Sequence, residues 1–189
     1  MDFLKTKKYN DRYSLLNAGI ELSPTNENDL WLEFGVYTGT TINFISELNP
    51  KNTIFGFDSF YGLPENWRPG MDKGSFNTNG DFPNVNENVV IIPGWFEDSI
   101  PKFLEENSNK NISFLHIDCD LYSSTIDILF GCHERIVSGT VICFDEFFNY
   151  PVWEDHEYKA WNEYCNTYDI RYDYVGHVPT GEQVLLVIK

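Results

Sequence analysis

Two apolar stretches of the sequence end in carboxylates. One stretch, "FLHID", ends in Asp118, and the other, "VICFDE", ends in Asp145 and Glu146. If these carboxylates converge, their mutual repulsion raises the pKa of at least one of them. A divalent cation removes that repulsion, and Mg²⁺ in particular prefers hard oxygen ligands. The pattern is therefore suited to a metal centre with Asp118, Asp145 and Glu146 as ligands.

Distant carboxylates can meet only if the elements that carry them end at the same edge of a sheet. Compact apolar runs predict strands over residues 30–36, 53–58, 88–94, 112–118, 139–147, 170–176 and 183–189. Apolar residues at helical spacing predict helices over residues 13–22, 40–48, 96–107, 124–136 and 153–165. This alternation predicts an α/β fold with one doubly wound, Rossmann-like, mostly parallel seven-stranded sheet and a C-terminal antiparallel hairpin. Ligands bind such sheets at the C-terminal ends of the strands.

The chain length and one long loop define the expected domain organisation. A chain of 189 residues fits a single domain over residues 1–189, with an N-terminal helical extension over residues 1–28. Residues 59–87 show no sustained periodicity but carry several aromatic side chains. A loop of this length in a compact domain is usually functional or disordered, and disordered segments are poor in aromatics. We therefore expect residues 59–87 to form a lid over the active site.

Composition excludes several classes of partner. Thirteen basic and twenty-nine acidic residues produce a net charge of −16, which repels nucleic acids and anionic membrane surfaces. The four cysteines show no metal-binding or redox spacing and are expected to be reduced thiols. The sequence also shows no signal peptide and no apolar run of membrane-spanning length, so we expect a cytoplasmic protein.

The first strand-to-helix turn, "EFGVYTG", indicates which cofactor the sheet binds. Gly35 and Gly39 allow the backbone of this turn to approach a ligand closely. The GxGxxG fingerprint of dinucleotide-binding turns is absent, and so is a P-loop. Glu33, just before the turn, suits an amino group or a cation better than a phosphate. Asp58, at the end of the next strand, can accept both ribose hydroxyls of an adenosine.

Five successive motifs carry a family resemblance: "WLEFGVYTGTTINFI", "GFDSFYGLPENW", "GWFEDSIP", "LHIDCDLYSST" and "VICFDEF". In this order they resemble the motifs of class I S-adenosylmethionine-dependent methyltransferases. The stretch over about residues 29–150 is similar in particular to the macrocin-type (TylF-like) sugar O-methyltransferases. The resemblance implies an S-adenosylmethionine-dependent O-methyltransferase that acts on a hydroxyl of a sugar, a glycan or a glycosylated metabolite.

The resemblance also implies a set of cofactor-binding residues. Glu33, Gly35 and Gly39 line the methionine end, Asp58 holds the ribose, and the turn at Gly94 flanks the adenine. An aromatic face there can stack on the purine. The complete implied set is Glu33, Gly35, Tyr37, Thr38, Gly39, Asp58, Ser59, Gly94, Trp95, Phe96 and Asp118.

The resemblance places a metal at the carboxylate cluster, where we also expect the catalytic base. In the family an Asp after the fourth strand and an acidic pair after the fifth bind a divalent ion, here expected to be Mg²⁺; this sequence has Asp-Glu where Asp-Asp or Asp-Asn is usual. Asp118 is the expected base that takes the acceptor proton, with His116 as the alternative base or a buried, hydrogen-bonded residue. Asp120 is expected to cap the helix that begins near Ser123.

Other functions stay open from the sequence alone. The acceptor could be a small phenolic compound or an amine instead of a sugar. The chain could also be a cofactor-binding protein without catalysis or a doubly wound NAD-dependent oxidoreductase, although the missing GxGxxG disfavours the latter. A homo-oligomer is also possible.

Overall fold

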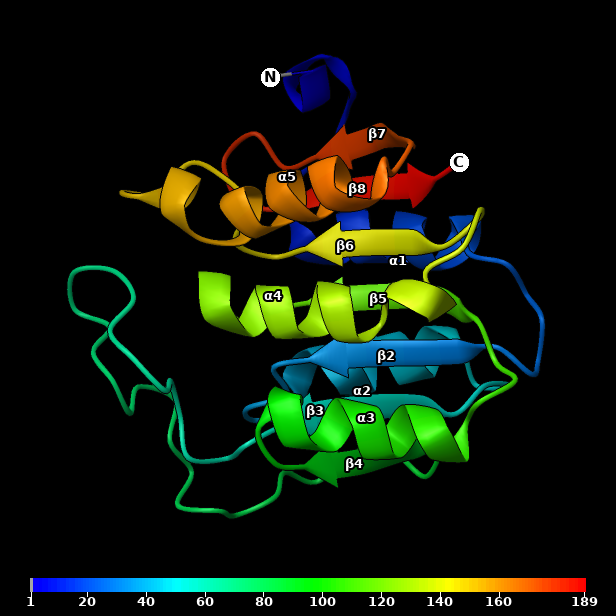
Figure 1. The fold of residues 1–189 in the computed structure, drawn as a ribbon, viewed down its shortest axis with the longest axis vertical. Coiled ribbons are helices and arrows are strands. Elements are labelled where there is room, and N and C mark those ends of the chain that lie inside the picture. Colours follow the sequence, from blue (N-terminus) through cyan, green and yellow to red (C-terminus); the bar gives the residue numbers. More distant parts are fainter. Residues whose placement is uncertain (1) are drawn as a thin grey trace.

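The computed structural model describes residues 2–189 and contains one eight-stranded sheet with helices on both faces (Figure 1). The strands are β1 (Lys7–Lys8), β2 (Leu30–Phe34), β3 (Ile54–Asp58), β4 (Val89–Pro93), β5 (Ile112–Ile117), β6 (Val141–Phe144), β7 (Tyr172–His177) and β8 (Val184–Ile188). The α-helices are α1 (Arg12–Leu22), α2 (Thr40–Leu48), α3 (Phe96–Glu106), α4 (Tyr122–Gly131) and α5 (Glu157–Tyr168). Short 3-10 turns are formed by Asp2–Lys5, His133–Arg135 and Trp153–Asp155.

The strand order in the sheet is β1-β7-β8-β6-β5-β2-β3-β4. Strands β6, β5, β2, β3 and β4 run parallel, whereas β8 is antiparallel to both β6 and β7. The predicted fold class and C-terminal hairpin are therefore confirmed. The strand count is eight instead of seven, because Lys7–Lys8 pairs with the end of β7 at the sheet edge. A pair of exposed lysines has no apolar periodicity that could have indicated this strand.

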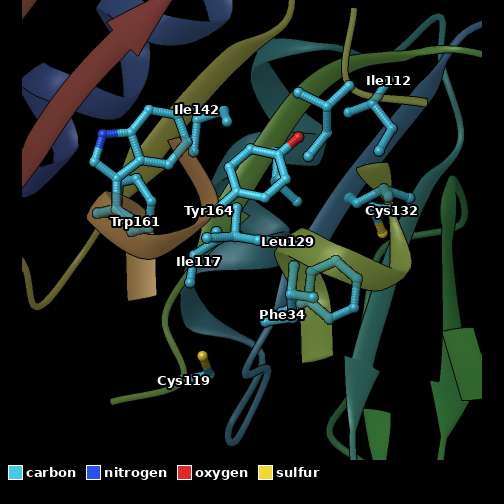
Figure 2. Close-up of a cluster of buried hydrophobic side chains, with 14 of the residues drawn as sticks. Phe34, Ile112, Ile117, Cys119, Leu129, Cys132, Ile142, Trp161 and Tyr164 are labelled. Carbon is cyan, nitrogen blue, oxygen red and sulfur yellow. The ribbon is translucent and has the colours of Figure 1, made fainter. Parts of the chain in front are cut away.

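Each sheet face is covered by its own layer of helices. Helices α3, α4 and α5 cover one face, and α1 and α2 cover the other (Figure 1). Figure 2 shows the core on the first face, where Leu129 of α4 and Trp161 and Tyr164 of α5 pack over strand residues such as Ile117. A second core lies under α1 and α2. Side chains alternate along each strand, so successive residues enter opposite cores.

Two predicted helices have different boundaries in the structure. The helix predicted over residues 124–136 ends at Gly131 and is followed by a 3-10 turn. The helix predicted over residues 153–165 begins only at Glu157. Before it, Val152 adopts a left-handed backbone conformation with a φ of 62°, and a separate 3-10 turn follows. Helical spacing alone does not reveal such breaks.

Residues 59–87 contain no helix or strand, but they are tied to the domain by packing and hydrogen bonds. Phe60 is buried in the core beneath α1 and α2. Trp67 packs with Leu121 and Tyr150, which follow β5 and β6. The Nη1 atom of Arg68 lies 2.8 and 2.9 Å from the two carboxylate oxygens of Glu182. The loop therefore spans from the β3 end of the sheet to the β8 end.

Within residues 2–189, no helix is both long enough and apolar enough to cross a membrane. The four cysteines are all free thiols, and three of them are buried. Burial raises the pKa of the Cys132 thiol to about 12. These thiols therefore pack as small apolar side chains in the core.

Candidate active site

A cavity of about 690 Å³ opens at the C-terminal ends of the parallel strands. Its walls come from the turn after β2, the loop over residues 59–87, the start of α3 and the start of α4. Its size lies in the range of small-molecule sites in proteins. The predicted site residues that line it are Gly35, Tyr37, Thr38, Asp58, Ser59, Trp95, Phe96, Asp118 and Glu146. The predicted residues outside its lining are Glu33, Gly39, Gly94, His116 and Asp145.

The turn after β2 requires glycine because a side chain there would collide with the protein's own backbone. Gly35 has a φ of 95°, and a Cβ at this position would lie 1.7 Å from the carbonyl oxygen of Asp118. The ends of β2 and β5 are thus in close backbone contact, with the Asp118 N–H donating to the Phe34 carbonyl at 2.9 Å. Gly39 also has a positive φ, of 80°, and is the N-cap of α2. Glycine tolerates both conformations without strain.

Asp58 holds this turn in place. One of its oxygens, Oδ2, accepts hydrogen bonds from the backbone N–H groups of Val36 at 2.9 Å and Tyr37 at 2.8 Å. The other oxygen, Oδ1, accepts from the N–H of Phe60 at 2.8 Å. A single carboxylate therefore connects the first turn of the sheet to the start of the 59–87 loop. It does so at the edge of the cavity.

Aromatic side chains form the wall on the α3 side. Trp95 is the N-cap of α3, and 40% of its surface is exposed although it lies at the cavity. Phe96 packs edge-on against Phe34 at 5.2 Å between ring centroids. Gly94 turns the chain ahead of them with a φ of 132°. The exposed indole face is suited to stacking on a planar ring.

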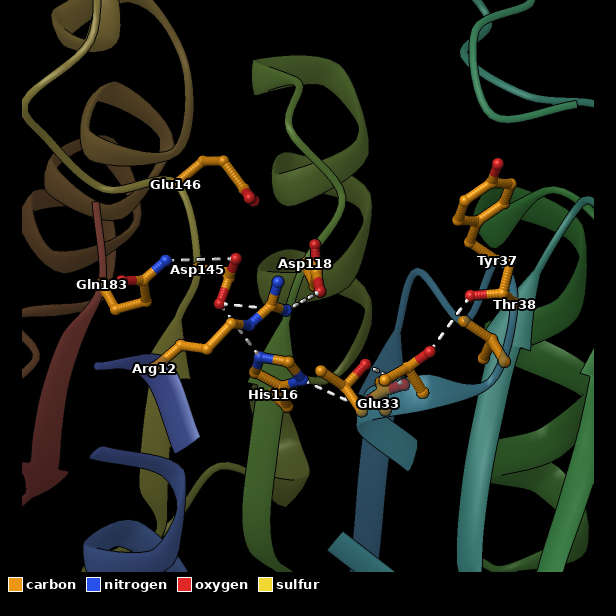
Figure 3. A network of polar contacts seen from close by, with 12 residues as sticks. Arg12, Glu33, Tyr37, Thr38, His116, Asp118, Asp145, Glu146 and Gln183 are labelled. Atoms are coloured by element: carbon orange, nitrogen blue, oxygen red, sulfur yellow. Dashed lines mark hydrogen bonds and ion pairs between the residues drawn. The ribbon is translucent and has the colours of Figure 1, made fainter. Parts of the chain in front are cut away.

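Buried charges meet on the opposite side of the cavity, on the sheet face that α1 covers. Glu33 in β2 lies directly opposite His116 in β5, which in turn lies opposite Cys143 in β6. Asp145 follows Cys143 by two residues, so it points to the same face. Figure 3 shows the side chains of Glu33, His116 and Asp145 converging, with Arg12 reaching in from α1.

These groups form a row of alternating charge, which we call the charge row: Glu33, His116, Asp145, Arg12 and Asp118. The Nδ1 atom of His116 lies 2.9 Å from Oε2 of Glu33, and its Nε2 atom lies 3.8 Å from Oδ1 of Asp145. The Nη2 atom of Arg12 lies 3.3 Å from the same Asp145 oxygen and 2.7 Å from Oδ2 of Asp118. The row therefore runs without interruption from the β2 turn to the cavity wall.

Burial and the charges within the row shift the pKa values of its members. Burial alone would lower the pKa of the His116 imidazole, but Asp145 and Glu33 raise it to about 10. Burial acts to raise the pKa of Asp145, but His116 and Arg12 outweigh it and hold that pKa below its ordinary value. Burial and the charge of Asp145 raise the pKa of Asp118 to about 7. His116 is therefore a charged partner with no solvent exposure, and it is poorly placed to be a base in contact with an acceptor.

Arg12 is the member of the row that the sequence analysis missed. The predicted first helix began one residue after it, whereas α1 begins at Arg12 itself. Asp11 is the N-cap, and it exchanges hydrogen bonds with Ser14 in a capping box. The signal in the sequence is spacing: Arg12 stands three and four residues before the buried Leu15 and Leu16. It therefore lies on the apolar face of the helix.

The donor set offers a direct test of the predicted metal centre. Atoms of His116, Asp118 and Asp145 lie within 4.8 Å of one another and could hold an ion, but Glu146 is not part of this group. Burial and the charge of Asp145 raise the pKa of Glu146 well above its ordinary value. Moreover, the Arg12 guanidinium lies between the two aspartates. The residues as arranged do not fit a divalent ion.

Asp120 does not have the capping role that we predicted for it. The N-cap of α4 is Leu121, which makes no side-chain cap hydrogen bond. Asp120 instead adopts a positive φ of 67° and lines the cavity. Burial and the charge of Asp118 raise its pKa well above the ordinary value. The helix begins at Tyr122, so the N-cap position falls on Leu121, one residue after Asp120.

Solved structures of other proteins share this architecture. The chain superposes on the calicheamicin methyltransferase CalS11 with a TM-score of 0.73 and 23% identity, covering 93% of this chain and 76% of that chain. It superposes on the O-methyltransferase NovP with a TM-score of 0.68 and 21% identity, covering 93% and 78% of the two chains. These similarities show the fold, which is that of the class I methyltransferases.

The profile of the macrocin O-methyltransferase (TylF) family matches residues 73–176, more than half of the chain. The chain belongs to this family, as its motifs predicted. One relative, the demethyldecarbamoylnovobiocin O-methyltransferase of Streptomyces niveus, is 31% identical over 78 residues. That match covers 40% of this chain and 28% of the relative's length.

Proposed function

We propose that this protein is an S-adenosylmethionine-dependent O-methyltransferase that methylates a hydroxyl of a small sugar-containing acceptor or a glycan. The observation that carries the proposal is the position of Asp118. Its carboxylate lines the same cavity as the partly exposed Trp95, so a base and an aromatic stacking surface share one space. Family membership and the methyltransferase fold support the same reaction.

The cofactor side of the cavity fits S-adenosylmethionine in its chemistry. The volume of about 690 Å³ leaves room for a cofactor and part of an acceptor. Trp95 and Phe96 would flank the adenine, and Asp58 with Ser59 would contact the ribose. Gly35, Tyr37 and Thr38 would border the methionine portion. When bound, S-adenosylmethionine supplies an electrophilic methyl group on its sulfonium.

Glu33 and Gly39, predicted as cofactor contacts, do not line the cavity and would act indirectly, through the residues that do. Glu33 is fully buried, accepts a hydrogen bond from Thr41 at 3.2 Å and pairs with His116. Thr41 itself lines the cavity. We therefore propose that Glu33 positions the β2 turn and Thr41 instead of contacting the cofactor directly. Gly39, as the α2 N-cap, sets the direction in which that turn leaves the sheet.

Asp118 is the proposed base. Its Oδ2 atom is held by Arg12, and within residues 2–189 its Oδ1 atom has no hydrogen-bond partner. That free oxygen would accept the proton of the acceptor hydroxyl as the hydroxyl oxygen takes the methyl group from the sulfonium, whose sulfur–methyl bond breaks so that S-adenosylhomocysteine leaves. A pKa of about 7 places the carboxylate where proton transfer at neutral pH is efficient. His116 then acts as a positioning residue, because it orients Asp145 and through it Arg12.

The 59–87 loop would form the acceptor side of the site. Leu63, Trp67 and Arg68 from this loop line the cavity. Arg68 lies over the Trp67 ring at 3.8 Å and pairs with Glu182, so this wall combines a flat aromatic surface with fixed charges. Such a surface suits the apolar face and hydroxyl groups of a sugar. Because these loop residues line the cavity, we propose that residues 59–87 act as its lid.

The proposal is tested by cofactor binding followed by transfer of label. Isothermal titration calorimetry with S-adenosylmethionine, S-adenosylhomocysteine and NAD should show binding of the first two and none of NAD. Labelled cofactor should then transfer its methyl group to members of a panel of nucleotide sugars and glycosides. Binding of NAD alone would overturn the assignment. Label transfer only to phenols or amines would replace the proposed acceptor class.

A further inference from the structure

Arg12 occupies the place between Asp118 and Asp145 that a divalent cation would need. Its Nη2 atom is within 2.7 Å of one carboxylate and 3.3 Å of the other. An Mg²⁺ ion bound to the same two oxygens at about 2.0–2.1 Å would overlap with that nitrogen. Arginine stays charged under all ordinary conditions. One fixed positive charge therefore already offsets the repulsion between these carboxylates.

The fold holds Arg12 in this position from several sides. The capping box between Asp11 and Ser14 fixes the first turn of α1. Leu15 and Leu16 in the next turn are completely buried against the sheet. At Gly19 a Cβ would lie only 2.9 Å from the side chain of Leu185 in β8, so the helix packs closely on the strands. A displacement of Arg12 would therefore have to come from its side chain and not from α1.

Arg12 also faces the cavity, where an acceptor would lie. It lines the cavity, and 33% of its side chain remains exposed. A carboxylate that receives a guanidinium on one oxygen has its plane fixed, which leaves the other oxygen pointing in a defined direction. Arg12 can thus orient Asp118 without coordinating the acceptor.

We propose that Arg12 is the built-in cation of this site, that it takes the place of a divalent ion, and that methyl transfer here proceeds without a divalent metal. The claim that methyl transfer proceeds without a metal rests on the proposed function. The claim that Arg12 replaces a divalent ion concerns only the charges of the folded chain, and it is tested without cofactor or acceptor.

Manganese binding provides that test, followed by electron paramagnetic resonance of free Mn²⁺ and by calorimetry. Wild type should show only weak surface binding, whereas Arg12→Ala should bind one Mn²⁺ at least about tenfold more tightly, because a like charge has been removed from the site. Arg12→Gln keeps a hydrogen-bond donor without the charge and should behave like Arg12→Ala. If Arg12→Ala fails to fold, Arg12→Gln provides the same test.

Two controls separate this site from the general acidity of the chain. Arg171→Ala removes the same charge from an exposed position just before β7, at the opposite edge of the sheet, and should leave Mn²⁺ binding unchanged. Adding Asp145→Asn to Arg12→Ala should abolish the new site. The proposal is overturned if wild type and Arg12→Ala bind Mn²⁺ equally, or if neither Arg12→Ala nor Arg12→Gln gains an Mn²⁺ site.

Activity provides the second test once an acceptor is found. Wild type should retain its rate after exhaustive treatment with EDTA, and added Mg²⁺ should change that rate by less than about twofold. Arg12→Ala should lose at least about tenfold in kcat and recover part of it with guanidinium or Mg²⁺. A wild-type rate that EDTA abolishes and Mg²⁺ restores would overturn the metal-free reaction. A complete absence of methyl transfer would instead overturn the proposed function and leave the Mn²⁺ result standing.

Discussion

On one side of the cavity, the turn after β2 is held by backbone N–H groups that donate to Asp58, only 22 residues away in the sequence. On the other side, Asp118 is held by Arg12, which lies 106 residues away. The first side is a local arrangement of a glycine turn and a strand-end carboxylate. The second is a set of charges from α1, β2, β5 and the end of β6 that meets only in the folded protein. Local motifs therefore define the cofactor side, and tertiary packing defines the acidic side.

The largest effect is expected at the acidic side, where Asp118 is the proposed base. Asp118→Asn removes the proton acceptor and should reduce kcat by about 10²–10⁴-fold. Cofactor affinity, measured by calorimetry, should stay within about twofold because the turn and Trp95 are untouched. Asp173→Asn, at an exposed position in β7, is the matched control. Near-normal turnover of Asp118→Asn would remove Asp118 from the mechanism.

The charge row should also contribute strongly to stability. His116→Leu leaves Glu33 and Asp145 buried without their shared partner, and should lower the free energy of unfolding by about 3–5 kcal/mol. His116→Gln should lose less, because its amide can still donate a hydrogen bond. Urea denaturation measures both variants. A loss below about 1 kcal/mol for His116→Leu would show that the row is not a tightly coupled unit.

The cofactor side should respond to Asp58 mainly through affinity. Asp58→Ala leaves three backbone N–H groups without their acceptor, and should loosen the turn and weaken S-adenosylmethionine binding by about tenfold. Asp58→Asn keeps one oxygen acceptor, and its affinity for S-adenosylmethionine should lie between those of wild type and Asp58→Ala. Asp72→Ala, exposed in the 59–87 loop, should leave binding unchanged. Unchanged affinity in Asp58→Ala would contradict the role of this carboxylate in shaping the turn.

The smallest effect is expected from the aromatic wall. Trp95→Ala should weaken cofactor binding by about fivefold, corresponding to the loss of roughly 1 kcal/mol of stacking. Trp95→Phe keeps an aromatic face and should recover most of that affinity. Calorimetry with S-adenosylhomocysteine measures both. If the alanine variant binds normally, the indole packs against the protein alone and does not contact the adenine.

Much of the fold followed from local patterns. The apolar runs predicted β2, β3 and β5 to within about a residue or two, because strands buried on both faces are nearly continuous in apolar residues. The doubly wound architecture likewise predicted a ligand site at the C-terminal ends of these strands. Two local expectations were wrong for local reasons: β1 is too short to show periodicity, and α4 begins at Tyr122, so its N-cap is Leu121 and not Asp120.

The sequence by itself determined the alternation of strands and helices, the glycine turn and the family, because these depend on spacing within short segments. It also placed carboxylates at the ends of β5 and β6, which led us to expect a metal. Only the tertiary structure decided which cation meets them. The first turn of α1 packs under β6, far from Asp118 in the sequence, and this packing brings Arg12 to 2.7 Å from its carboxylate. Charges that are distant along the chain leave no local pattern, so their pairing becomes visible only when the helix and the strands are packed together.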